Sequence, residues 1–173
     1  MTTDDSTQAD QVEMVGRPVG SDIAAMAFAL QQARFAEAHL DVPVGAVMVR
    51  EGIVIAARHN ERELTGDPTA HAEILAIRDA AAVFGNWHLD DCTLYVTLEP
   101  CSMCAGAMVL ARVPRVVYGA SDPKAGAGGS LFNLLAEPRL NHRCLVETGL
   151  MADECGAVLK AFFASRRRRR RSI

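Results

Sequence analysis

Long apolar runs are missing from this chain, and their absence narrows the class of protein. The longest run, Ile23 to Leu30, has eight residues, whereas a helix that spans a bilayer needs about 20. Residues 1–20 contain four acidic side chains and no apolar stretch like that of a secretory signal peptide. We therefore expect no membrane association and no export.

The sequence also lacks the patterns of a disulfide framework and of a nucleotide-binding P-loop. Five cysteines in 173 residues do not suggest the disulfide framework that is typical of small secreted domains. The glycines at 126, 128 and 129 are not followed by Gly-Lys-Ser or Gly-Lys-Thr, so they do not form a nucleotide-binding P-loop. The few cysteines favour a reducing cytoplasm as the compartment. Half of the chain is apolar, which is enough for one domain with its own core.

Positive charge is concentrated at one end of the chain. Residues 166–171 are six consecutive arginines, while the other residues carry 12 basic and 21 acidic side chains. Such a run can be a solvated extension of the last helix. It can also bind a phosphate backbone, because each neutralised phosphate releases counterions. We favour nucleic-acid contact for this basic tail, residues 166–173.

One pattern of residues carries specific chemistry. His71-Ala72-Glu73 is followed by Pro100-Cys101-Ser102-Met103-Cys104. One imidazole and two thiols supply three of the four ligands of a tetrahedral zinc ion, and a site with three protein ligands keeps its fourth position for water. Glu73 is suited to move the protons of that water. The pattern His-x-Glu with Pro-Cys-x-x-Cys is typical of zinc-dependent nucleobase deamination.

Two other interpretations of the cysteine pair are weaker. A redox pair should open the first helix of a thioredoxin-like βαβ unit, and no such pattern precedes Cys101. A structural zinc site needs a fourth ligand at a matching spacing, and Cys92 is expected to be a small core residue instead. A catalytic zinc is favoured because structural sites are closed by four protein ligands.

The pattern of apolar residues and breakers predicts helices and strands in alternation. We expect helices at 21–38, 70–84, after 101, at 131–135 and at 152–163, and strands at 44–50, 53–58, 94–98, 115–119 and 145–148. Both halves of the metal site then lie at helix N-termini, which favour the thiolate form of cysteine. This order predicts a three-layer α/β/α fold with a mixed five-stranded central sheet. We divide the chain into a disordered acidic leader (1–20), one catalytic domain (21–165) and the basic tail.

Several segments resemble the bacterial tRNA-specific adenosine deaminases, and together they extend from about residue 21 to about residue 165. These segments are Pro68–Ile74, Leu94–Cys101, Met103–Met108, Gly119–Lys124 and Asn141–Arg143. The resemblance implies a cytidine-deaminase-like fold, a homodimer, and conversion of the wobble adenosine (position 34) in the anticodon stem-loop of an arginine tRNA to inosine.

The resemblance and the chemistry together assign roles to residues. His71, Cys101 and Cys104 are expected to hold one zinc ion, and Glu73 to transfer protons. Asn60 matches the asparagine that binds the nucleoside in this family, although a turn cap after the preceding strand is an alternative. The remaining expected substrate contacts are Val42, Pro43 and Val44 around the base, and Asp122, His142 and Arg143 on the tRNA.

Two other functions remain open. A deaminase of free nucleobases or nucleosides, such as guanine or cytosine, would share the zinc pattern but would have no use for the arginine tail. A non-catalytic RNA-binding subunit of the same fold would be expected to lack Glu73, which this chain contains.

Overall fold

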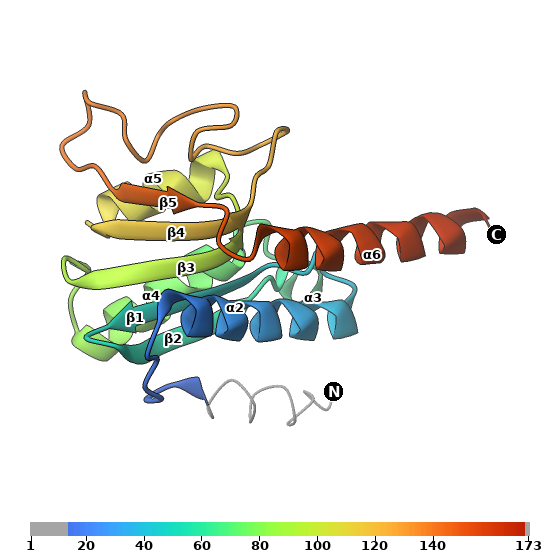
Figure 1. Cartoon of the computed structure of the whole chain (residues 1–173), viewed down its shortest axis with the longest axis horizontal. Helices are drawn as coiled ribbons and strands as arrows, with labels where there is room; N and C mark the ends of the chain where they lie inside the picture. Colours follow the sequence, from blue (N-terminus) through green and yellow to red (C-terminus); the bar gives the residue numbers. More distant parts are fainter. Residues whose placement is uncertain (1–13, 172–173) are drawn as a thin grey trace.

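The computed structural model describes residues 14–171, with side chains through Arg169, around one mixed sheet (Figure 1). The strands are β1 (Gly45–Arg50), β2 (Ile53–His59), β3 (Cys92–Leu98), β4 (Arg115–Ala120) and β5 (Leu145–Thr148), in the order β2-β1-β3-β4-β5. Strand β1 runs antiparallel to β2 and β3, whereas β3, β4 and β5 are parallel. The predicted mixed five-stranded sheet is confirmed.

Helices cover both faces of the sheet, which confirms the three layers. Helices α2 (Asp22–Ala36) and α6 (Ala152–Arg171) pack on one face, and α4 (Ala72–Phe84) and α5 (Ser102–Leu110) on the other. Neighbouring strand residues point to opposite faces, so Val47 and Val117 face α2 while Met48 and Val116 face α4 and α5. Two short helices, η1 (Glu37–His39) and α3 (Arg62–Thr65), complete the described elements.

Residues 14–20 differ from the predicted disordered leader, because they are attached to strand β2. Gly16 donates to the carbonyl oxygen of Val54 at 2.8 Å, and Val54 donates back to Arg17 at 3.0 Å. Met14 is buried with 1% of its surface exposed. Strand β2 lies at the sheet edge, where unpaired backbone groups accept such a segment. The rest of the predicted leader, residues 1–13, lies outside the described residues.

Two predicted helices differ from the structure: one is absent, and the other is longer than predicted. The helix predicted at 131–135 is wrong, because the backbone N–H groups of Leu131 and Phe132 donate to Gly126 across the loop and not along a helix. The helix predicted to end at Phe163 continues as α6 to Arg171.

Within residues 14–171, no helix is both long and apolar enough to cross a membrane.

Candidate active site

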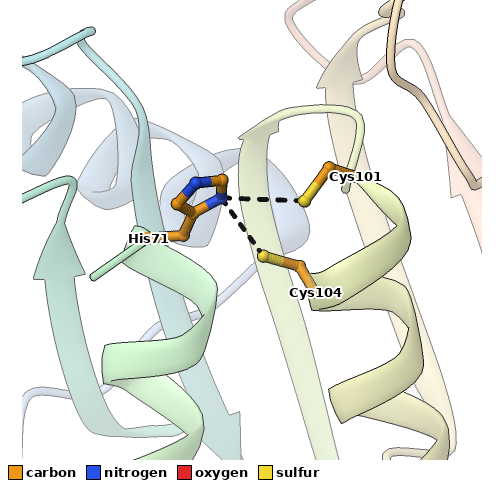
Figure 2. A group of neighbouring side chains, drawn as sticks. All are labelled: His71, Cys101 and Cys104. Carbon is orange, nitrogen blue, oxygen red and sulfur yellow. Dashed lines mark hydrogen bonds between the residues drawn. The ribbon is translucent and has the colours of Figure 1, made fainter. Parts of the chain in front are cut away.

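Two helix N-termini bring the predicted metal ligands together. His71 is the N-cap residue of α4 and Cys101 the N-cap residue of α5, with Cys104 in the first turn of α5. Strand β3 ends at Leu98, two residues before Pro100, and the two helices lie on the same sheet face. The three side chains point toward one another from these two elements (Figure 2).

The distances between the ligand atoms fit a tetrahedral zinc ion. His71 Nδ1 lies 3.5 Å from Cys104 Sγ and 3.7 Å from Cys101 Sγ. Zinc bonds of about 2.3 Å to sulfur and about 2.05 Å to nitrogen, at a tetrahedral angle, separate the two atoms by about 3.6 Å. Among the residues that the structure describes, this is the one group of three metal-ligating side chains within 4.8 Å.

The electrostatics of the triad favour a thiolate at Cys101. Hydrogen bonds with the Cys104 thiol and the His71 ring lower the pKa of Cys101 to about 3, although burial opposes this shift. The pKa of Cys104 is raised, first by its hydrogen bond with Cys101 and then by burial. The thiolate is the form of cysteine that binds a metal ion.

Glu73 lies beside the triad as the second residue of α4. Only 4% of its surface is exposed, and this burial raises the pKa of its carboxyl group. A carboxyl group with a raised pKa binds a proton more readily than an ordinary carboxylate does, as a general base and acid must. The arrangement therefore places a carboxyl group with a raised pKa against the three potential metal ligands.

A pocket of about 160 Å³ opens above these residues at one end of the sheet. It lies where β1 begins and where β2, β3 and β4 end. The residues that line it are Val42, Val44, Asn60, Arg62, His71, Glu73, Leu98, Glu99, Cys101, Asp122 and Ala125. The structure thus brings the predicted residues Val42, Val44, Asn60 and Asp122 to the same pocket as the triad.

Asn60, which lines this pocket, has a side-chain acceptor that no described residue uses. Its Nδ2 donates to the carbonyl oxygen of Val42 at 3.3 Å, which fixes the orientation of the amide. Its Oδ1 is buried without a hydrogen-bond partner among the described residues. An unpaired buried acceptor is costly, so a ligand that donates a hydrogen bond there would remove an existing penalty.

Three predicted contact residues are not brought to the pocket. Pro43 is buried but is not among the lining residues. His142 places Nε2 2.8 Å from the carbonyl oxygen of Val113, and Arg143 is exposed outside the pocket lining. Contacts of these residues with a substrate stay predictions.

Sequence reasoning missed Glu99, whose carboxylate accepts hydrogen bonds from the loop at residues 122–130. Its Oε1 accepts from the backbone of Gly128 at 3.1 Å and Ser130 at 2.9 Å, and its Oε2 accepts from Asp122 at 2.8 Å. The Ser130 hydroxyl also donates to Oε2. Burial acts to raise the pKa of Glu99, but these hydrogen bonds outweigh it and lower the pKa. An acidic residue between an apolar strand and Pro100-Cys101 was the available signal.

The glycines of this loop make room for the Glu99 carboxylate. A Cβ atom at Gly126 would lie 2.3 Å from Cδ of Glu99, and one at Gly128 would lie 2.8 Å from the Tyr118 ring. Ala127 also donates to the carbonyl oxygen of Pro100 at 2.8 Å. The loop that supplies Asp122 and Ala125 is therefore tied to the segment that carries Cys101.

This fold and this site define a deaminase of the cytidine-deaminase-like fold. A family model for MafB19-like deaminases matches residues 21–167. The tRNA-specific adenosine deaminase of Bacillus subtilis (strain 168) is 50% identical over 144 residues, which cover 83% of this chain and 89% of that protein. The chain belongs to the tRNA-specific adenosine deaminase family, as its sequence segments predicted.

Solved structures agree with this assignment. A structure from work on A-to-I editing by tRNA:A34 deaminases has a TM-score of 0.76 and 44% identity, and covers 78% of this chain and 98% of that chain. A guanine deaminase from Nitrosomonas europaea has a TM-score of 0.78 and 27% identity, with coverage of 90% and 91%. The shared fold therefore extends to deaminases of free bases.

Replacing Glu99 tests its role in holding the loop. In Glu99→Gln, an amide NH₂ would face backbone N–H donors, so we expect the free energy of unfolding to fall by roughly 1–3 kcal/mol. Urea denaturation measures this change, and amide hydrogen exchange should rise at residues 122–130. The control is Glu137→Gln, which loses a surface ion pair with Arg139 that contributes little to stability because water screens it. Equal stability and equal exchange in both variants would contradict the role of Glu99.

Proposed function

We propose that this chain catalyses the hydrolytic deamination of adenosine to inosine at wobble position 34 of tRNA, with an arginine tRNA as the expected substrate. The observation that carries the proposal is the meeting of His71, Cys101, Cys104 and Glu73 at one pocket in a member of this family. A tRNA substrate implies that the enzyme acts in the cytoplasm.

His71, Cys101 and Cys104 would hold the zinc ion. Zinc in such a site lowers the pKa of a water molecule toward about 7, which supplies a nucleophile at neutral pH. Glu73 accepts a proton from the water that attacks C6 of the purine. Glu73 delivers this proton to N1. It then accepts the proton of the new hydroxyl group on C6 and delivers it to the amino group, which leaves as ammonia while C6 keeps the oxygen of inosine.

The pocket lining explains how an adenosine would be held. The apolar side chains of Val42, Val44 and Leu98 offer surfaces for the base, and Asn60 Oδ1 is an acceptor ready for a donor of the nucleoside. The base has to leave its stack to enter the pocket, which costs least in a single-stranded loop such as an anticodon.

We also propose that two copies of the chain form a homodimer through an apolar surface beside α5. Leu110, Leu131 and Phe132 are 71%, 52% and 57% exposed, and a second copy packed over them would remove this apolar surface from water. Leu134, in the same segment, packs beside α5 at Gly106.

Incubation of the purified protein with total tRNA tests the proposed activity. Sequencing should detect inosine at position 34, whereas free adenosine and guanine should stay intact. Glu73→Gln should keep bound zinc but lose turnover by about 10²–10⁴-fold, because it removes proton transfer and not a ligand. The control Glu154→Gln changes an exposed residue of α6 and should stay active. Guanine deamination without inosine in tRNA would refute the proposal.

Light scattering after size-exclusion chromatography tests the dimer. The measured mass should be twice that of the 18.6 kDa chain, and Phe132→Ser should lower it toward one chain because it removes an apolar contact. The control Val83→Ser alters a residue that is also exposed, but on α4, and should remain dimeric. A wild-type mass of one chain would exclude the dimer.

A further inference from the structure

The arginine run is built into the fold as the last turns of helix α6. The helix is continuous from Ala152 to Arg171 and extends well beyond the sheet (Figure 1). It begins where β5 ends, at the same end of the parallel strands as the pocket. The start of α6 is packed tightly there, because a Cβ atom at Gly119 of β4 would lie 2.4 Å from Cys155 Sγ.

Arg166 contacts the turn that precedes a pocket-lining segment of the chain. Its guanidinium donates to the carbonyl oxygen of Leu40 at 3.5 Å and lies 5.6 Å from the ring centroid of Phe162, a buried residue of the same helix. Leu40 is two residues from Val42, which lines the pocket. The side of α6 that carries Arg166 therefore lies against the turn at Leu40, next to the segment that enters the pocket.

The turn at Leu40 also positions a second arginine. The next residue, Asp41, is 1% exposed, and its carboxylate accepts from the backbone of Glu63 at 2.8 Å and Leu64 at 3.2 Å. These bonds hold the first turn of α3, which opens with Arg62. Arg62 is exposed, and it is the one cationic arginine or lysine among the residues that line the pocket.

Glu61, the residue before Arg62, does not pair with it. Glu61 is turned into the protein, where its carboxylate accepts from Arg58 at 2.8 Å, and it is only 8% exposed. Arg62 therefore brings a positive charge to the lining of the pocket.

Helical geometry selects which further arginine continues this surface. Residues three apart lie on the same side of a helix, so Arg169 follows Arg166. Arg167 is rotated by about 100° from Arg166 and points away from that side. Both Arg167 and Arg169 are exposed. We name the set Arg62, Arg166 and Arg169 the basic strip.

We propose that the basic strip binds backbone phosphates of the RNA strand whose base occupies the pocket. Arg62 takes a phosphate beside the inserted nucleotide, and Arg166 and Arg169 take phosphates farther along the strand. A guanidinium group has five donors, so Arg166 can bind phosphate while it keeps its bond to Leu40. Arginine matches phosphate oxygens in a bidentate geometry.

This inference rests on the proposed function and makes it more specific. A free base carries no phosphate, so the basic strip would favour a polynucleotide over the nucleobases that fit the same fold. It also predicts which arginines of the run contact RNA, because only one side of α6 faces the RNA.

The slope of log affinity against log salt concentration tests the basic strip. Binding of an anticodon stem-loop RNA is measured for the wild type, Arg62→Gln, Arg169→Gln and the charge-matched control Arg167→Gln. Each lost phosphate contact in a single-stranded loop should make the slope shallower by about 0.7. We expect this change for Arg62→Gln and Arg169→Gln, and the wild-type slope for Arg167→Gln. Zinc content and thermal melting of every variant report whether the fold is intact.

Two results would overturn the basic strip. One is an equal change for Arg167→Gln and Arg169→Gln, which would show contact without a preferred side. The other is a wild-type slope for Arg62→Gln and Arg169→Gln. Inosine formation by the wild type is measured in parallel and decides the proposed function separately. If the wild type edits the RNA while the slopes are unchanged, only the basic strip fails.

Discussion

The convergence of three ligand atoms on one point is the constraint on which the rest of this structure depends. His71 comes from the start of α4, and Cys101 and Cys104 come from the start of α5. Their atoms meet only if both helices begin at the same depth on one face of the sheet. The register of β3 sets that depth for Cys101, and the buried face of α4 sets it for His71. The core therefore positions the site.

Two buried carboxyl groups beside this point have opposite properties because their surroundings differ. Glu99 accepts hydrogen bonds from three backbone N–H groups, which lower its pKa and keep it ionised. Glu73 is buried beside the triad, and loss of solvent raises its pKa. A fixed anion suits a structural fastening, and a carboxyl group with a raised pKa suits proton transfer.

Much of the fold and of the site could be predicted from local sequence patterns. The metal ligands and Glu73 follow from spacing, and the strands follow from alternating apolar residues between turn signals. Contacts between distant segments could not be predicted in this way. The backbone N–H groups of Leu131 and Phe132 donate to Gly126, and residues 14–20 pair with the edge of β2. Arg62 reaches the pocket because Asp41 holds α3. Each of these contacts joins residues that lie 5 to 38 positions apart in the sequence.

X-ray absorption at the zinc edge tests the central claim, three protein ligands with one open position, most directly. The purified wild type should contain one zinc ion per chain with two sulfur ligands at about 2.3 Å and two nitrogen or oxygen ligands at about 2.0–2.2 Å. Cys104→Ser should lose one sulfur ligand or the metal, whereas Cys144→Ser, at a buried cysteine outside the triad, should keep the wild-type spectrum. Four sulfur ligands, or an active protein without zinc, would contradict the account.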